Sequence, residues 1–162
     1  MMFNGLFVKE AKVIFITGPA DYNAAAATAE WIDMGKYDKV VFIIKTGAWA
    51  GGTAAVTLQQ ATTNAGTPAA LAFTKMFTND GAPTSDTLTE TAVTSNTFNI
   101  DTASSIYVIE VDAAMLNVSS GYRWVNLAIA APSGDNADFY DAMALAMKAR
   151  YMAGSGLPSA IA

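Results

Sequence analysis

The chain has 162 residues, of which 52% are hydrophobic and only 14% are charged, and its formal net charge at pH 7 is −5. This length suits one domain spanning residues 1–162, and the acidic balance argues against nucleic acid as a partner, because phosphates are bound by Lys and Arg. The sequence has no basic run for an anionic membrane surface and no apolar run long enough to cross a bilayer. It has neither Cys nor His, which excludes disulfides and removes the commonest general base and metal ligand.

The N-terminal part begins without a clear periodicity, so residues 1–11 are predicted to form an extended arm. Residues 12–17 are predicted to be a short buried strand, which a following Gly-Pro pair is expected to end. The Ala-rich residues 21–27 lack an apolar stripe and are predicted to be a loop. Alternating apolar and polar residues then predict another strand at 28–34.

The strongest strand signal lies in residues 37–61. Residues 40–44 are a continuous run of β-branched and aromatic side chains, which is typical of a strand buried on both faces. Residues 56–59 alternate apolar with polar, which predicts a half-buried strand. Three glycines separate the two runs. The pair is therefore predicted to be a β-hairpin with Trp49 at its tip, where little of the domain can cover the indole.

Short alternating segments continue at intervals of roughly ten to fifteen residues, which is the spacing of a sandwich or a barrel. Strands are predicted at residues 71–77, 87–94, 98–100, 106–112 and 122–130, with a helical turn or a β-turn at 113–116. The Thr-rich segment among them is expected to be an exposed or edge strand.

Two interpretations remain open for residues 138–152. The content of Ala, Met, Leu and Lys favours a helix by propensity. At period two, however, five large side chains fall on one face, and the many preceding strands favour a strand here as well. These side chains are Phe139, Met143, Leu145, Met147 and Tyr151. Residues 153–162 are predicted to be a flexible tail whose apolar tip can dock on a neighbour.

No nucleophilic site is predicted. Without His or Cys, a nucleophile would depend on a Ser–Lys pair, a Thr or a pair of carboxylates. The sequence Lys45-Thr46-Gly47 has the letters of a β-lactamase box, but the chain has no Ser-x-x-Lys to accompany it. We interpret these letters as the end of a strand.

The acidic residues likewise predict no site. Glu110 and Asp112 share one face of a strand and are expected to face solvent or a partner subunit. The densest acidic cluster, Asp135, Asp138 and Asp141, lacks the spacing of an EF-hand loop and is expected to be solvated. We therefore expect no catalytic residue, no cofactor and no metal.

Contacts with another chain are favoured instead. The charged fraction is about half the usual share, which predicts that a neighbour covers part of the surface. An exposed Trp in a Gly-rich turn is costly unless it packs on another chain or a ligand. The predicted contact residues are Phe3, Leu6, Phe7, Trp49, Gly51, Gly52, Leu157, Pro158 and Ile161.

Several segments, including YDKVVFIIKTG at residues 37–47 and YVIEVDA at 107–113, resemble a family of structural proteins of tailed bacteriophages and prophages. The matching segments are residues 37–47, 54–61, 70–75, 86–89, 107–113, 121–127, 149–151 and 157–161. They are structural strings without catalytic motifs, so no functional residue is carried over. The resemblance implies a virion component that is made in the bacterial cytoplasm and assembled onto a capsid.

Together these observations predict an all-β antiparallel sandwich of jelly-roll type with an N-terminal arm and a flexible C-terminal tail. The expected function is that of a capsid decoration or cement protein on the outer surface of a phage head. Its expected partners are the major capsid protein and two further copies in a homotrimer. The alternatives are a head–tail connector or tail component, a carbohydrate-binding module and, last, an enzyme.

Overall fold

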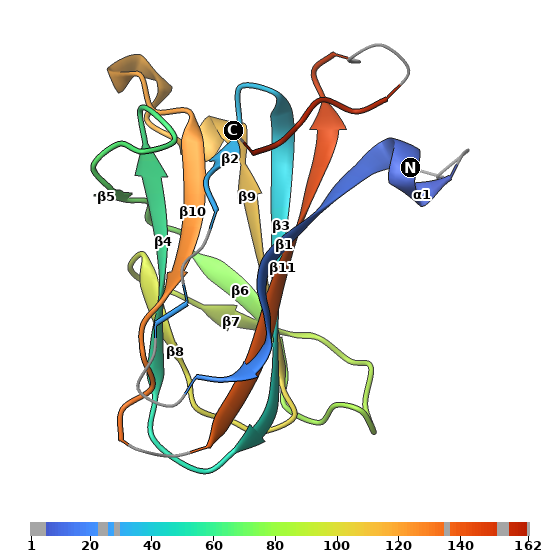
Figure 1. Cartoon of the computed structure of the whole chain (residues 1–162), viewed down its shortest axis with the longest axis vertical. Helices are drawn as coiled ribbons and strands as arrows, with labels where there is room; N and C mark the ends of the chain where they lie inside the picture. Colours follow the sequence, from blue (N-terminus) through green and yellow to red (C-terminus); the bar gives the residue numbers. More distant parts are fainter. Residues whose placement is uncertain (1–5, 23–25, 28–29, 135–136, 152–155, 162) are drawn as a thin grey trace.

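Two antiparallel β-sheets pack face to face in the computed structural model and enclose one hydrophobic core (Figure 1). The structure describes residues 6–22, 26–27, 30–134, 137–151 and 156–161. One sheet has six strands in the order β1-β11-β3-β9-β6-β7, and the other has five, in the order β2-β10-β4-β5 with β8 also paired to β4. The predicted all-β sandwich is confirmed. No helix among the described residues is long and apolar enough to span a membrane.

The strands have the following bounds. They are β1 (Ala11–Asp21), β2 (Ile32–Asp33), β3 (Tyr37–Trp49), β4 (Ala54–Ala61), β5 (Ala69–Ala70), β6 (Lys75–Asn79), β7 (Thr89–Ala92), β8 (Thr97–Ile100), β9 (Ile106–Asp112), β10 (Trp124–Ile129) and β11 (Asp138–Ala149). The helical elements are α1 (Phe7–Glu10) and two 3₁₀ turns, η1 (Ala113–Met115) and η2 (Val118–Ser120).

The connectivity is that of a jelly roll. The first four strands pair with the last four in reverse order: β1 with β11, β2 with β10, β3 with β9 and β4 with β8. Consecutive strands from β1 to β4 alternate between the sheets, as do those from β8 to β11. Such a chain wraps as one long antiparallel pair around a common core. Strands β5, β6 and β7 are an insertion, and β6 and β7 extend the six-stranded sheet beyond β9.

Alternation of side chains along β3 and β4 builds the core. In β3, Val40, Phe42 and Ile44 are fully buried, whereas Val41 and Ile43 between them are partly exposed. The prediction that this strand is buried on both faces is therefore wrong, because no part of the chain that the structure describes forms a second layer over its outer side. In β4, Val56 and Leu58 point inward, which confirms the half-buried strand.

The predicted hairpin of β3 and β4 is also wrong. The two strands follow each other in sequence, but β3 pairs with β11 and β9, and β4 pairs with β10, β5 and β8. The glycines between them carry the chain from one sheet to the other. Gly52 has a φ of +82°, and a Cβ at this position would overlap the carbonyl oxygen of Ser133, so only glycine fits.

Strand β11 resolves the two interpretations of residues 138–152 in favour of a strand, and helix propensity is overridden. The predicted grouping of Phe139, Met143, Leu145 and Met147 on one face is correct, but that face points outward. The inward positions are Asp138, Tyr140 and three alanines, which are buried. Small inward side chains leave room for the larger core residues of neighbouring strands.

Three further predictions differ from the structure. Strand β1 does not end at Gly18-Pro19; it continues to Asp21 through two register shifts, because irregular pairing with β11 accommodates the residues that disfavour a regular ladder. The strand predicted at 71–77 is interrupted, since residues 71–74 carry the chain from β5 to β6 in the other sheet. The strand predicted at 28–34 is limited to β2 among the residues that are described there.

Other predicted elements are present. Strand β7 is the edge strand expected from the Thr-rich segment, and β8, β9 and β10 lie within or close to their predicted ranges. The turn predicted after β9 is η1. The loop predicted at 21–27 falls partly outside the described residues.

Candidate interaction surfaces

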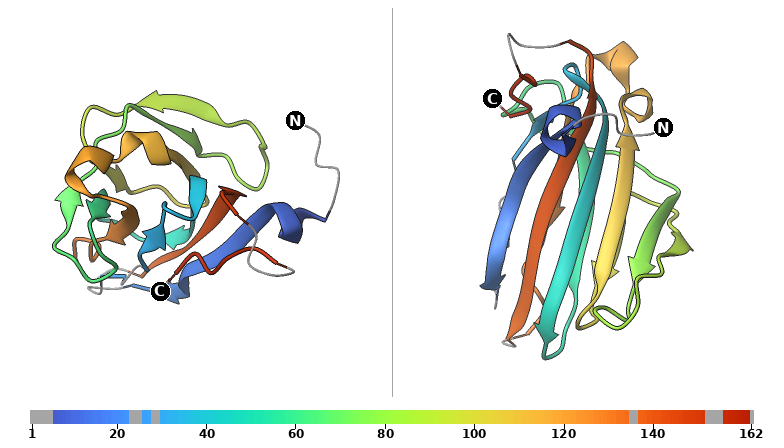
Figure 2. Two further views of the ribbon diagram at one scale, coloured as in Figure 1. Left: turned by 90° about the horizontal axis from the view of Figure 1, so that it is seen from above. Right: turned by 90° about the vertical axis from the view of Figure 1, so that its right-hand side faces the viewer.

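The outward side of the six-stranded sheet is lined by apolar side chains. One row of aligned residues crosses five strands, from Phe15 through Met143, Ile43 and Val108 to Phe77. A second row aligns Val13, Leu145 and Val41. We call these eight residues the outer face. Figure 2 shows β1, β11, β3 and β9 side by side in its right-hand view, with α1 crossing only one end of them.

Among the described residues, no layer covers the outer face. Phe15 is 69% exposed and Val13 is 53% exposed, and the remaining six side chains are partly exposed. Contiguous apolar surface of this kind is characteristic of an interaction site rather than of a free protein surface. This feature of the molecule was not predicted as a surface, because the sequence alone did not show which side of β11 faces the core.

Ion pairs border the outer face. Lys39 Nζ lies 2.5 Å from Glu110 Oε2, Lys45 Nζ lies 3.2 Å from Asp141 Oδ1, and Lys75 pairs with Glu90 at 3.2 Å. The hydrogen bond to Glu110 raises the pKa of Lys39 and keeps the ammonium charged. Each of these three lysines is thus matched by a carboxylate. The prediction that Glu110 and Asp112 share an exposed face is confirmed.

The Trp49 loop packs on its own domain. The indole is half-buried against the core, and its Nε1–H donates to the Gly52 carbonyl oxygen at 3.1 Å. The Oδ1 atom of Asp138 accepts from the backbone N–H of Ala50 at 2.9 Å and of Gly51 at 3.3 Å. The expectation of an uncovered Trp at a hairpin tip is therefore wrong, because the turn crosses between sheets and is held against β11. Whether this loop also contacts another chain stays a prediction.

The acidic cluster does not form one site. Asp138 is fully buried, which corrects the expected solvated position, while Asp141 pairs with Lys45 on the outward side of the sheet. Asp135 lies outside the described residues. Within the described ranges, no three acidic side chains lie close enough together to hold a metal ion.

Aromatic rings fill the core beside Asp138. The rings of Tyr22 and Tyr140 stack with centroids 4.1 Å apart, and the Trp49 ring lies 6.5 Å from that of Tyr140. Burial, together with the neighbouring Tyr22, raises the pKa of the Tyr140 phenol well above its ordinary value. Among the described residues, the buried Tyr140 hydroxyl has no hydrogen-bond partner.

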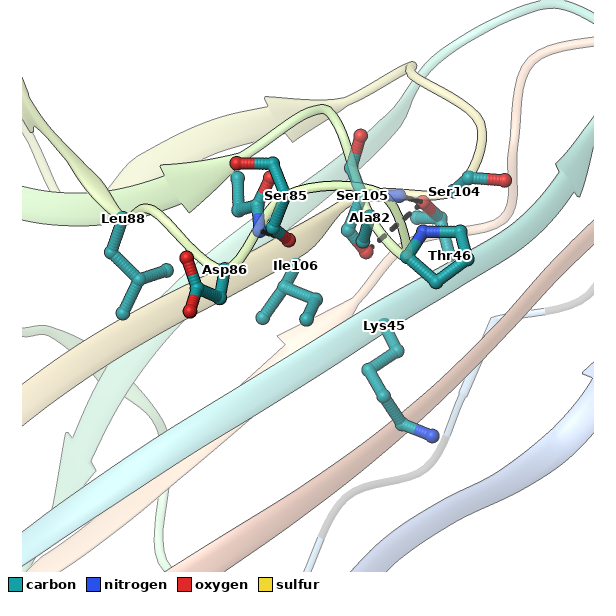
Figure 3. Close-up of a pocket in the computed structure, with 11 residues that line it drawn as sticks. Lys45, Thr46, Ala82, Ser85, Asp86, Leu88, Ser104, Ser105 and Ile106 are labelled. Atoms are coloured by element: carbon teal, nitrogen blue, oxygen red, sulfur yellow. Dashed lines mark hydrogen bonds between the residues drawn. The ribbon is translucent and has the colours of Figure 1, made fainter.

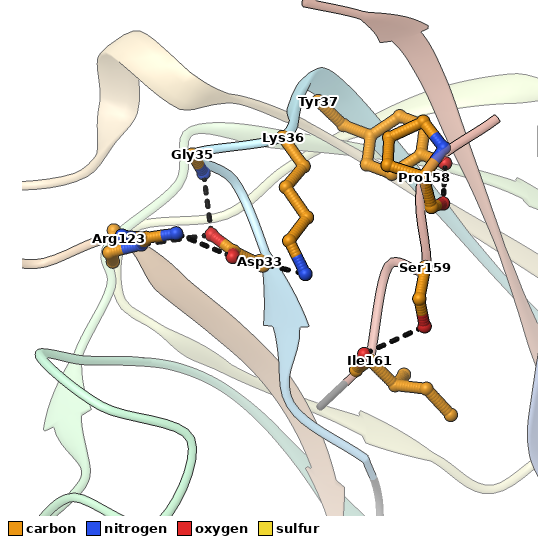
Figure 4. Close-up of polar contacts among 8 residues, drawn as sticks. All are labelled: Asp33, Gly35, Lys36, Tyr37, Arg123, Pro158, Ser159 and Ile161. Atoms are coloured by element: carbon orange, nitrogen blue, oxygen red, sulfur yellow. Dashed lines mark hydrogen bonds and ion pairs between the residues drawn. The ribbon is translucent and has the colours of Figure 1, made fainter. Parts of the chain in front are cut away.

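The C-terminal tail is anchored to the sandwich over its described residues, 156–161 (Figure 4). The buried hydroxyl of Tyr37 donates to the Pro158 carbonyl oxygen at 2.5 Å, and the backbone N–H of Asp33 donates to the Ala160 carbonyl oxygen at 2.8 Å. Pro158 and Ala160 are buried. The prediction of a flexible tail is wrong for this segment, because a buried Tyr hydroxyl requires an acceptor and the tail supplies it.

An ion pair fixes the end of β2 next to this anchor. The buried carboxylate of Asp33 accepts from Arg123 Nε at 2.9 Å and Nη2 at 2.5 Å, and also from the Gly35 backbone N–H at 2.9 Å (Figure 4). Lys36 Nζ lies 3.6 Å away. The bidentate geometry joins β2 to the residue before β10. Sequence reasoning missed this pair because its members are 90 positions apart.

The predicted contact residues are thus distributed over both ends of the sandwich. Leu6 and Phe7 are exposed at α1, a helical turn that replaces the last part of the predicted extended arm because Lys9 N–H donates to the Leu6 carbonyl oxygen at 2.8 Å. Phe3 lies outside the described residues. Leu157 and Ile161 are partly exposed in the anchored tail. The structure does not bring these residues together into one patch.

A cavity of about 550 Å³ lies between the loop that follows β6 and the ends of β3 and β9 (Figure 3). Two of its polar side chains are engaged: Thr46 Oγ1 donates to the Thr102 carbonyl oxygen at 2.6 Å, and Asn79 Nδ2 donates to the Ser85 carbonyl oxygen at 2.7 Å. Figure 3 shows the Lys45 side chain extending away from the serines that line the cavity, so it forms no Ser–Lys pair with them.

Comparison with known proteins adds one structural neighbour. A scan against models of protein families found none that matches the chain, and a search of curated proteins found no match. Among solved structures, the chain is similar to the crystal structure of the SPBc2 prophage-derived protein YomS, with 11% sequence identity and a TM-score of 0.44. The similarity covers 88% of this chain and 98% of YomS. A likeness at this level assigns no function.

Proposed function

We propose that this chain is a non-enzymatic structural protein of a bacteriophage virion, and specifically a decoration protein that binds the outside of the head. The observation that carries the proposal is the outer face: eight apolar side chains on the surface of a chain with only 14% charged residues. The resemblance of its segments to phage structural proteins supplies the class of partner, and the jelly-roll sandwich is compatible with it.

The proposed mechanism needs no chemistry. A protein that binds only the assembled shell stabilises that state by mass action, and contacts across capsomer boundaries resist the pressure of packaged DNA. The proposed partners are the major capsid protein and other copies of this chain, in a particle assembled in the bacterial cytoplasm. The bordering ion pairs leave little unbalanced charge to oppose docking.

The two non-enzymatic alternatives differ in how well they fit the structure. A head–tail connector or tail component would use the same sheet face and differs only in copy number. A carbohydrate-binding module would need an aromatic ring free to stack on a sugar, whereas Trp49 is half-buried and its N–H is engaged within its own loop. The indole on which this alternative was based is therefore not free to stack on a sugar.

The first test is the number of copies of this chain relative to the major capsid protein in purified virions, measured by quantitative mass spectrometry. A ratio near one, or a simple fraction set by the lattice, supports the decoration role. A handful of copies per particle moves the protein to the neck or tail, and absence from the virion contradicts a virion role.

The second test addresses the surface. Shells lacking this protein are mixed with purified wild-type chain or with Met143→Glu, and binding is measured by co-sedimentation. Met143→Glu places a charge in the middle of the outer face and is expected to abolish binding. Gln59→Glu, at a partly exposed position of the other sheet, is the matched control and should bind like wild type. Equal binding by both variants would show that another surface meets the shell.

A further inference from the structure

The strand edges of the two sheets differ in a way that points to a contact between copies. The end strands β7, β2 and β5 have four, two and two residues, and β7 carries Glu90 and two threonines. In contrast, β1 ends the six-stranded sheet with 11 residues, and no described strand pairs with its other side. A long unpaired edge exposes a row of backbone donors and acceptors that can pair with another chain.

The first half of β1 is built as a regular strand. Residues Ala11 to Phe15 pair with β11 without a register shift, and the shifts begin only after Phe15. Its outward side chains include Val13 and Phe15, the two most exposed members of the outer face. Lys12 is the only charged residue between positions 11 and 16. Edges are usually protected by charges, bulges or a covering segment. Here α1 covers only the first residue, since Ala11 is buried and its N–H donates to the Phe7 carbonyl oxygen, and the described residues after Ala11 have little such protection.

We propose that the first half of β1 pairs antiparallel with the first half of β1 from a second copy of this chain. The length of the strand indicates which strand pairs with it. Among the described strand edges, only that of β1 itself offers more than four residues for pairing. Pairing a strand with its own copy gives a two-fold axis through the contact, in which each surface patch meets itself. The trimer expected from sequence would instead need β1 to meet a different surface.

The side chains and charges suit this arrangement. In a register centred on Ile14, Phe15 of one copy lies opposite Val13 of the other, which gives two aromatic–aliphatic pairs on the outer face. The two Lys12 residues then lie four positions apart along the strands, about 14 Å at the rise of an antiparallel strand and beyond the screening length in physiological salt. Two acidic chains can thus meet here without opposing carboxylates.

Such pairing would join two six-stranded sheets into one continuous sheet of twelve strands with a doubled outer face. As a step that rests on the proposed function, this would let one pair engage two neighbouring sites on a shell, and the second contact would be intramolecular. The pairing itself does not require the decoration role, because it concerns only copies of this chain.

The experiment measures the mass of the purified full chain by sedimentation equilibrium. Wild type should have twice the chain mass of 16.9 kDa, and Val13→Lys/Phe15→Lys should have the mass of one chain, because lysines at both positions oppose each other across the contact. Val118→Lys, at an exposed position in η2, should stay paired. Wild type with the mass of one or three chains overturns the proposal, and so does a paired double-lysine variant.

A cross-linking experiment tests the same contact without depending on the folding of the double-lysine variant. The chain has no Cys, so Val13→Cys introduces a single thiol. A short bis-maleimide linker should convert Val13→Cys into covalent pairs, whereas Glu90→Cys, on the opposite edge strand of the same sheet, should remain single. Absence of linked Val13→Cys pairs overturns the proposal. Both arms use protein free of virions, so their outcome is independent of the copy-number test.

Discussion

The anchor between Tyr37 and the C-terminal tail allows a prediction from the removal of a single oxygen atom. The Tyr37 side chain is fully buried, and its hydroxyl donates to the carbonyl oxygen of Pro158, 121 positions away, at 2.5 Å. Tyr37→Phe keeps the ring and its packing but removes the donor. The Pro158 carbonyl, also buried, then loses this partner.

The expected cost follows from these two effects. A net contribution of about 1 kcal/mol is typical of one intramolecular hydrogen bond, and leaving a buried acceptor unsatisfied raises the cost to about 1–3 kcal/mol. We expect a loss of about 2 kcal/mol for detachment of the tail, which corresponds to roughly a 30-fold increase in the detached population. The Asp33 amide should report this opening, because it donates to the Ala160 carbonyl oxygen in the tail.

The assay combines hydrogen exchange of the Asp33 amide and of peptides covering 156–161 with urea unfolding. Tyr37→Phe should accelerate exchange at these sites and lower the free energy of unfolding, while Tyr151→Phe, which removes an exposed hydroxyl, should change neither. Unchanged exchange in Tyr37→Phe would refute the reasoning, because the tail would then be held by packing alone.

Three further changes have defined outcomes. Arg123→Ala removes two hydrogen bonds from the buried Asp33 carboxylate and should lower the free energy of unfolding in urea by about 2–3 kcal/mol. This is less than the cost of breaking a fully buried pair, because Arg123 is half-exposed. Arg123→Lys should recover only part of the loss, and full recovery would show that the bidentate geometry is unimportant. Gly52→Ala should lower the free energy of unfolding by at least about 2 kcal/mol, because of its positive φ and the overlap with Ser133. Gly156→Ala should be tolerated, because a Cβ there would meet nothing within 4 Å. Equal unfolding midpoints for the two variants would contradict this. Burial raises the pKa of Tyr140, so its contribution to stability is present below about pH 10, where the unfolded phenol is also protonated, and is lost as the pH rises towards the higher folded value. Tyr140→Phe should therefore lessen the alkaline loss of stability by up to about 1.4 kcal/mol per pH unit. Parallel pH profiles of unfolding for the two proteins would exclude this role.

Local periodicity predicted which segments are strands far better than how those strands are arranged. Alternation in residues 56–59 and the apolar run in 40–44 depend on nearest neighbours along the chain, and both became strands. Whether two successive strands form a hairpin or cross between sheets depends on partners elsewhere. In this case the partners are β11 and β10, at least 63 positions from the strands they join, as in the pairing of Trp124 with Ala61.

The contact surfaces were predicted less well for the same physical reason. Large apolar residues were expected to mark a core face or a docking tip, so Trp49 and the tail were favoured as contacts, and both turned out to pack on their own domain. The outer face depends on the orientation of β11, where the buried positions hold alanines. A sequence pattern of small residues alternating with large ones cannot by itself distinguish inside from outside.

In residues 142–146 of β11 the small residues face inward and the large residues face outward, so the two sides of the strand are constrained in different ways. Ala142, Ala144 and Ala146 face the closely packed interior, where added volume is poorly tolerated, whereas Met143 and Leu145 face outward and touch the core little. Substitutions at the outward positions should therefore alter what the protein recognises while leaving its folding intact. Replacing alternate residues of this one strand should therefore change the binding partner of such a chain without changing its core.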